Sequence, residues 1–284
     1  MTTSTVPTLP VERTLVHRTR GSAHGPIARL VSPGDLGAGL KPCIVLDRFE
    51  SPAGGRPPQF GMHPHSGIAT LTYLMDGRAN YEDTTGAHGE RGVLPTCGVE
   101  WMMAGGGVWH RGGPVNAERV LGFQLWVAMP PELELTTAFS RYLDPAEIPR
   151  AGPARVLLGS YGGQSSPIPA PSEMTYLGVH LKAGEQWQFE SPQGHTVVWA
   201  AIGEGSLSAP AALRTGELVV FDRSGADITF TALEDTSFVL GSAVPHPYEM
   251  HMGSYSVHTS NEALQLGEHG IRERAQLLRE QGRL

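Results

Sequence analysis

The sequence predicts an all-β protein, on the basis of its composition and the spacing of its apolar runs. Glycine and proline supply 36 and 23 of the 284 residues, a share typical of many short strands joined by turns. Runs rich in β-branched and aromatic residues recur between these turn signals, and each is expected to form a strand. The runs cover residues 44–46, 68–74, 120–127, 155–158, 175–181, 196–202, 217–221, 228–231 and 237–241.

A segment rich in proline and glycine divides the chain. It extends over residues 144–172 and contains one short apolar run, as expected of a linker. We therefore expect an N-terminal barrel over residues 1–143, a linker over 144–172, and a C-terminal barrel with the chain end over 173–284. A weak internal repeat, in which residues 67–77 resemble residues 195–205, favours a duplicated β-sandwich or barrel.

The end of the chain predicts a short helix. Ile271, Ala275 and Leu278 fall at positions i, i+4 and i+7, with charged residues between them and no proline. This is the spacing of an amphipathic helix with one apolar face. We expect the helix to pack on the surface of a barrel.

Composition excludes several classes of protein. Hydrophobic residues make up 40% and charged residues 17% of the chain, so the signature of disorder is absent. The net charge of −7 disfavours direct binding of nucleic acid. Cys43 and Cys97 are the only cysteines, which indicates neither a disulfide framework nor a zinc cluster. No stretch resembles a signal peptide or a membrane-spanning helix, and we expect a soluble, cytoplasmic protein.

Three histidines are the strongest candidates for chemistry. His63 and His65 lie two residues apart at the start of a predicted strand, and side chains at i and i+2 of a strand point to the same face. His110 follows three glycines, which permit a backbone bend toward the first pair. Such a set can bind a metal ion, and the alternative is three hydrogen-bonded histidines with no ion.

Several motifs resemble those of the pirins, a family of two-domain cupins. The resemblance covers most of the chain and is carried by residues 63–67 (HPHSG), 70–73 (TLTY), 99–105 (VEWMMAG), 107–110 (GVWH) and the region 245–261. It implies two cupin-type β-barrels (jelly rolls) placed face to face.

The resemblance also implies a divalent metal in the N-terminal barrel. In pirins three histidines and one glutamate hold iron or another divalent ion, and the histidines correspond to His63, His65 and His110. We expect iron, with zinc, copper, nickel or manganese as alternatives. The glutamate does not correspond, because Gly112 stands in its place. Three neutral imidazoles remain suitable for these metals, and metal retention is expected to fall below about pH 6.5 as imidazoles protonate.

Two nearby residues could replace the missing glutamate. Glu100 precedes Trp101 on a predicted strand, and His88 lies in a glycine-rich turn. The ordinary interpretations are favoured for both residues, namely a carboxylate that faces solvent and a turn histidine. The choice between the two as a ligand stays open.

Aromatic and thioether side chains flank the histidines. Phe60, Met62 and Trp109 each lie within three residues of a proposed ligand, and we expect them to line a pocket for a planar aromatic molecule. The others are expected to fill the barrel; they are Trp101, Met103, Phe123 and Trp126. The second barrel offers only His195 where the first has its histidine pair, and we expect it to be structural.

Two functions follow from these observations. The resemblance implies a metal-dependent oxidation of a small aromatic substrate, similar to that of quercetin 2,3-dioxygenases. The sequence assigns no catalytic residue for this reaction. The alternative is a non-catalytic regulatory pirin that binds a protein partner and has a degenerate or empty metal site. No Ser-His-Asp order, phosphate loop or dinucleotide fingerprint appears in the sequence.

Overall fold

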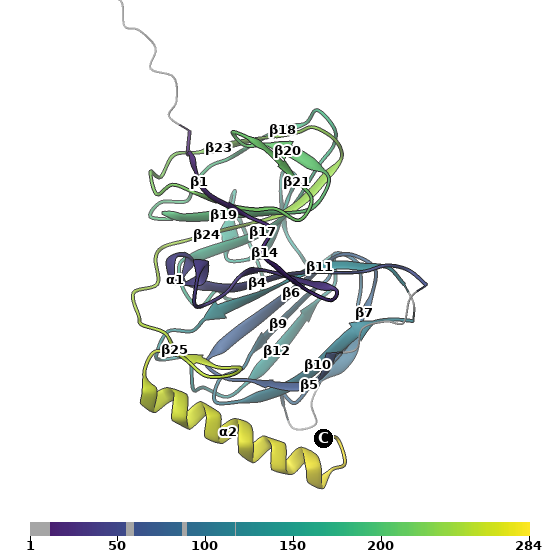
Figure 1. The fold of residues 1–284 in the computed structure, drawn as a ribbon, viewed down its shortest axis with the longest axis vertical. Helices are drawn as coiled ribbons and strands as arrows, with labels where there is room; N and C mark the ends of the chain where they lie inside the picture. Colours follow the sequence, from purple (N-terminus) through teal and green to yellow (C-terminus); the bar gives the residue numbers. More distant parts are fainter. Residues whose placement is uncertain (1–11, 55–59, 87–89, 117) are drawn as a thin grey trace, which may run out of the picture.

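Two β-barrels stacked on one another make up the fold (Figure 1). The structure is a computed structural model, and it describes residues 12–54, 60–86, 90–116 and 118–284. The all-β prediction is confirmed, as is the helix at the end of the chain. None of the helices in this described part is long and apolar enough to cross a membrane.

The N-terminal barrel consists of a seven-stranded and a four-stranded antiparallel sheet. The larger sheet has the order β12 (Phe139–Leu143), β9 (Val99–Met103), β6 (Ile68–Asp76), β11 (Val120–Ala128), β4 (Cys43–Ser51), β3 (Ile27–Val31) and β2 (Ser22–His24). The smaller sheet has the order β5 (Phe60–His65), β10 (Val108–Pro114), β7 (Ala79–Asp83) and β8 (Arg91–Leu94).

The C-terminal barrel has the same construction. Its seven-stranded sheet has the order β1 (Leu15–Thr19), β22 (Leu218–Phe221), β19 (Val197–Glu204), β24 (Thr236–Ala243), β17 (Met174–Leu181), β14 (Ala154–Leu158) and β13 (Arg150–Ala151). The four-stranded sheet has the order β18 (Gln186–Phe189), β23 (Ile228–Ala232), β20 (Ser206–Ser208) and β21 (Ala212–Arg214). The remaining elements are α1 (Leu36–Leu40), α2 (Asn261–Glu280) and two small hairpins, β15 (Ser160–Tyr161) with β16 (Gln164–Ser165) and β25 (His251–Met252) with β26 (Val257–His258).

The two barrels repeat one strand order. β6 lies between β9 and β11 in the first barrel, and β19 lies between β22 and β24 in the second. These two strands are the segments that resemble each other in the sequence. The weak repeat therefore corresponds to equivalent strands of a duplicated unit.

The first strand and the last helix each pack on the barrel that the other half of the chain forms. β1 pairs with β22 of the second barrel and occupies the position that β12 has in the first. Helix α2 returns to the first barrel, where Nε1 of Trp109 donates a hydrogen bond to the carbonyl of Ile271 at 3.0 Å. The division at residues 144–172 stays a prediction, but β13 and β14 from this segment belong to the large sheet of the second barrel. Partners in a sheet need not be neighbours in the chain.

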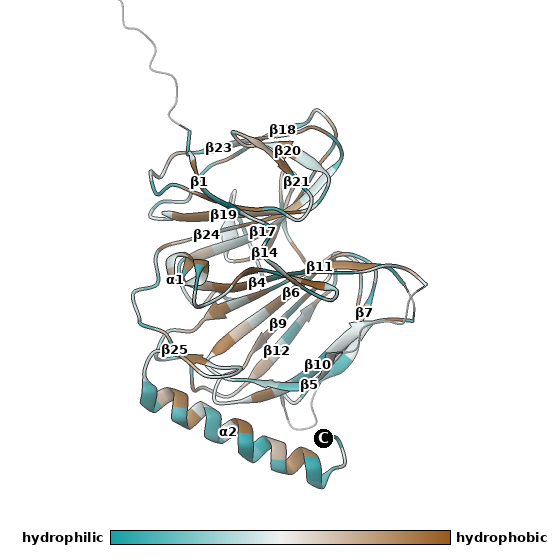
Figure 2. Cartoon of the chain, in the orientation of Figure 1, coloured by the Kyte–Doolittle hydropathy of each residue, from teal (hydrophilic) through white to brown (hydrophobic). Residues whose placement is uncertain are grey.

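The large sheets of the two barrels face each other, and their central strands β6, β9 and β19 are buried on both faces. Along β6, Ala69, Leu71 and Tyr73 join the core between the barrels, which also contains Trp199 of β19. Residues that alternate with them point into their own barrel. Figure 2 shows apolar residues along β4, β6 and β19, the strands at this junction.

The two barrel interiors differ. Large aromatic side chains fill the second barrel; they are Phe189, Phe221, Phe230 and Phe238. The first barrel has small apolar clusters around Ile68 and around Leu74, and the space between them is lined in part by polar side chains. The fold therefore leaves room for a site in the first barrel.

Candidate metal centre

The three predicted histidines meet inside the first barrel. His63 and His65 alternate along β5, and His110 of β10 lies directly opposite His63 in the ladder. One ring nitrogen from each of the three residues lies within 4.8 Å of the others. Nε2 of His65 is 3.1 Å from Nε2 of His110.

Hydrogen bonds orient two of these imidazoles. Nδ1 of His63 is 2.8 Å from the carbonyl oxygen of Gly61, and Nδ1 of His65 is 3.1 Å from that of Tyr255. A carbonyl oxygen only accepts hydrogen bonds, so Nδ1 carries the hydrogen in each ring. Nε2 of each of these two rings then carries a lone pair that can bind an ion.

Burial keeps the histidines neutral. It lowers the pKa of His63, and it lowers the pKa of His65 well below the ordinary value of 6.5. It lowers the pKa of His110 to about 3. Neutral imidazole is the form that binds metals, so the site does not need to lose protons at neutral pH.

The spacing and the donors fit a divalent transition metal. Two nitrogens bound to one ion at about 2.0–2.1 Å lie about 3.0–3.4 Å apart, and the 3.1 Å between Nε2 of His65 and Nε2 of His110 falls in this range. Imidazole ligands favour Fe, Zn, Cu or Ni over Mg and Ca. His63, His65 and His110 would hold the ion.

Glu100 lies beside this group, contrary to the expectation that it faces solvent. Its side chain points into the barrel and the residue is only 7% exposed. Its Oε1 is 3.9 Å from Nδ1 of His110, and burial raises its pKa to about 7. The expectation failed because both faces of β9 are buried: one face points into the first barrel, and the other packs against the second barrel. The sequence signal that could have indicated this burial is the position of the carboxylate within an apolar run.

The position of the missing glutamate faces the same cavity. Gly112 lines it, and a Cβ atom there would lie 3.2 Å from the carbonyl oxygen of Asn80. A side chain at residue 112 would therefore have to displace its neighbour only slightly. His88, the other candidate for a replacement ligand, lies outside the described residues.

The predicted pocket residues are placed differently. Phe60 begins β5, but its side chain lies outside the described part. Met62 alternates with His63 and lies on the opposite face of β5. Trp109 is bound to α2 through Ile271, which points its indole away from the histidines.

A cavity of about 340 Å³ adjoins the histidines. Trp126, which we expected to be filling, lines it and packs edge-on against His65 with ring centroids 4.7 Å apart. The wall opposite includes Tyr81, which stacks on Tyr142 with centroids 3.6 Å apart. Arg29 and Asp47, which form an ion pair, also line the cavity. Sequence reasoning missed Tyr81 because only strand pairing brings β7 to this wall.

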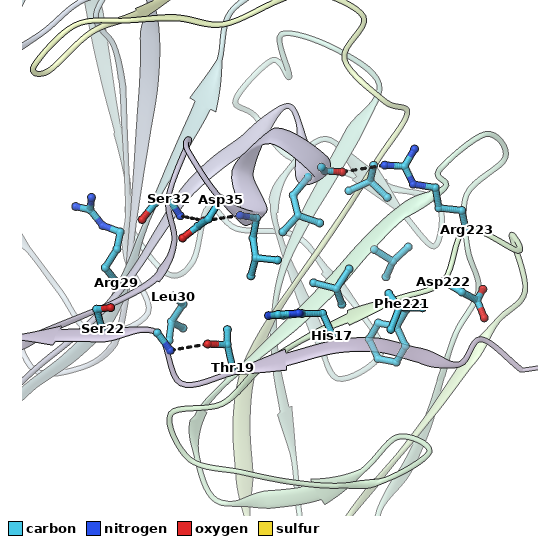
Figure 3. A pocket seen from close by; sticks show the side chains of 18 of the residues that line it. His17, Thr19, Ser22, Arg29, Leu30, Ser32, Asp35, Phe221, Asp222 and Arg223 are labelled. Atoms are coloured by element: carbon cyan, nitrogen blue, oxygen red, sulfur yellow. Dashed lines mark hydrogen bonds between the residues drawn. The ribbon is translucent and has the colours of Figure 1, made fainter.

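A larger hollow of about 890 Å³ lies between the barrels (Figure 3). Two of its polar side chains form hydrogen bonds with nearby backbone groups: Asp35 accepts one from the amide of Ser32, and Arg223 donates one to the carbonyl of Gly39. Within the described ranges, the group of His63, His65 and His110 is the one set of potential metal ligands that converges. The candidate site is therefore the smaller cavity.

The two barrels and their histidine centre define a bicupin with a candidate site for a divalent metal. The Pirin family profile matches residues 34–127. A Pseudomonas aeruginosa protein named "Putative quercetin 2,3-dioxygenase" is 34% identical over 65% of this chain and 69% of its own length. The chain belongs to the pirin family.

Solved structures share this fold. A quercetin 2,3-dioxygenase from Acinetobacter baumannii superposes with a TM-score of 0.83 and 22% identity, over 93% of this chain and 98% of that one. The Escherichia coli pirin YhhW, solved in complex with nickel(II), has a TM-score of 0.63 and 20% identity, over 79% and 95% of the two chains. These likenesses show the shared fold, and the histidine geometry of this chain is itself suited to a divalent ion.

Proposed function

We propose that this pirin binds a divalent metal, with iron as the first candidate. With this metal it uses O₂ to oxidise a small aromatic substrate, as a quercetin 2,3-dioxygenase does. The observation that carries the proposal is the cavity of about 340 Å³ beside three convergent histidines. Its size lies within the usual range for small-molecule sites, about 300–1,000 Å³. The names of the relative and of the structural neighbour support the same reaction class.

The metal would act as a Lewis acid toward a substrate oxygen and lower the cost of its negative charge. Trp126 and Tyr81 supply aromatic walls for a flat ring. Glu100 is the candidate general base, because it lines the cavity and its pKa of about 7 suits proton transfer at neutral pH. It would take the proton of a substrate hydroxyl and return it to the product. Both atoms of O₂ would enter the products, so no further reductant is needed.

The free thiols of Cys43 and Cys97 fit the reducing cytoplasmic compartment that we include in this proposal.

Oxygen consumption tests the proposal. Metal-free protein would be loaded separately with Fe, Cu, Ni, Mn or Zn and mixed with quercetin, while O₂ uptake is recorded. We expect uptake with at least one metal and a loss of at least about 100-fold in Glu100→Gln, the scale of a lost general base. Glu118→Gln, which alters an exposed carboxylate paired with Arg78, is the matched control and should keep full activity.

The second candidate is a regulatory pirin that binds a protein partner without catalysis. The observation that favours it is Gly112, which leaves the centre without a carboxylate at that place. Absence of O₂ uptake with every metal would remove the dioxygenase and leave this candidate.

A further inference from the structure

The chain returns to the first barrel after completing the second. We call residues 251–280 the C-terminal arm; it comprises the β25–β26 hairpin and helix α2 (Figure 1). Ser256 forms a parallel bridge with Ser66, and the amide of Val257 donates to the carbonyl of Ser66 at 3.3 Å. The arm is thus fastened to the residue that follows His65.

A buried line of side chains strengthens this attachment. Oγ of Ser66 lies 3.0 Å from Nε2 of His258, and Nδ1 of His258 lies 3.1 Å from Oε2 of Glu134. Ser66 is 0%, His258 2% and Glu134 3% exposed. Glu134 also accepts hydrogen bonds of 2.7 Å from the amide and the hydroxyl of Thr259. We call Ser66, His258 and Glu134 the clamp.

The clamp has the side-chain types of a hydrolase triad but no room for a substrate. Helix α2 covers it so closely that a Cβ atom on Gly267 would lie 2.3 Å from Nε2 of His258 and 2.5 Å from Oγ of Ser66. A nucleophilic serine needs space beside its oxygen for the reacting carbonyl. The clamp therefore joins parts of the chain and does not attack a substrate.

The attached segment reaches the metal centre itself. Ser254 and Tyr255 line the cavity, and the carbonyl of Tyr255 accepts the hydrogen bond from Nδ1 of His65. This carbonyl lies one residue from Ser256 and three from His258. Displacement of either attachment point would move the carbonyl away from the imidazole.

We propose that the C-terminal arm is a working part of the metal centre: the Tyr255 carbonyl fixes the ring orientation and tautomer of His65, and the clamp holds that carbonyl in place. A neutral imidazole has two tautomers, and only the one with hydrogen on Nδ1 presents a free Nε2 to an ion. Outer partners of metal-bound histidines typically change metal affinity about 10–100-fold. The inference rests on the metal site of the proposed function but not on the oxidation.

The tautomer of His65 is the first test, and it needs neither metal nor activity. Nitrogen-15 NMR of the full-length, metal-free protein distinguishes the two tautomers, and comparison with His65→Gln identifies the signals. We expect hydrogen on Nδ1 of His65 in the wild type and a mixture of tautomers in His258→Gln. Hydrogen on Nε2 in the wild type would overturn the inference, as would an unchanged tautomer in a folded His258→Gln.

Metal affinity is the second test. Titration with Co²⁺, followed by its visible absorption, should show binding weakened about 10–100-fold in His258→Gln. Gly267→Ala perturbs the clamp from the helix side without deleting a clamp residue, and should act in the same direction. His251→Gln is the matched control, because His251 belongs to the same arm but bonds to Asn261; it should bind as the wild type does.

The outcomes separate the two proposals. Equal Co²⁺ affinity in the wild type, His258→Gln and Gly267→Ala would refute a role for the arm. If the wild type binds no metal at all, the proposed function fails, and the NMR result alone decides whether the arm orients His65.

Discussion

Nε2 of His65 faces Nε2 of His110 at 3.1 Å, although 45 positions separate the two residues in the chain. The fold buries these nitrogens together inside the first barrel. At this distance one nitrogen can donate its hydrogen to the other, or both nitrogens can bind one ion. The folded protein is therefore prepared for a cation at this point.

Metal binding should stabilise the fold. An ion at 100 times its dissociation constant adds about 2.7 kcal/mol to the free energy of unfolding when it binds only the folded state. Thermal unfolding of metal-free and metal-loaded protein measures this difference. His110→Ala should abolish the shift, and an equal shift in that variant would show that the metal binds elsewhere.

Metal retention should persist to lower pH than the sequence alone predicts. The sequence predicts loss below about pH 6.5, but burial lowers the pKa of His110 to about 3 and that of His65 well below 6.5. Protons then compete with the ion only at lower pH. Dialysis at pH 8, 6.5 and 5 followed by elemental analysis should show full retention at pH 6.5. Half-loss near pH 6.5 would contradict the burial seen here.

The metal-free protein should lose stability in acid. The unfolded chain protonates His65 and His110 near their ordinary pKa of 6.5, whereas the folded protein keeps both neutral. The free energy of unfolding therefore falls as the pH drops below 6.5, by up to about 1.4 kcal/mol per pH unit for each residue. Denaturant titrations at pH 7 and 5.5 measure the effect. A His65→Gln, His110→Gln double variant should show a much smaller slope.

Glu100→Gln should have opposite effects on folding and on metal binding. Burial raises the pKa of Glu100 from 4.5 to about 7. The free energy of unfolding therefore falls as the pH rises from 4.5 through 7, because the unfolded chain ionises this carboxyl more readily. The neutral variant should then be more stable without metal at pH 8, by up to about 3 kcal/mol. It should also bind metal about tenfold more weakly, because it lacks the charge beside His110. Denaturant titration and Co²⁺ titration give the two values, and unchanged results in both would exclude a role for Glu100.

Gly112→Glu should restore an anionic ligand. The new Cβ atom meets the carbonyl oxygen of Asn80 at 3.2 Å, so the strand can accept it with a small adjustment. We expect metal affinity to rise about tenfold or more as the charge of the ligand set increases. Elemental analysis of identically prepared wild type, Gly112→Glu and Gly112→Gln checks this. A full equivalent of metal in all three would mean that another residue, such as Glu100, already supplies the charge.

The arm and the cavity walls show what local sequence patterns cannot reveal. Trp126 and Tyr81 line the cavity because β11 and β7 are brought to it by sheet pairing. Glu134 and His258 are 124 positions apart, and no short motif links them. Sequence reasoning excluded a serine–histidine–carboxylate order, yet the fold assembles one as a clamp.

The sequence by itself determined the β class, the strand repeat, the terminal helix and the three histidines, because these depend on local spacing. Alternation along β5 places His63 and His65 on one face whatever surrounds them. Only the tertiary structure decided that Glu100 is buried, that Trp109 anchors α2, and that Tyr255 reaches His65. Each of these depends on which distant segments pack together, and packing is a property of the assembled barrels that no single stretch of the chain encodes.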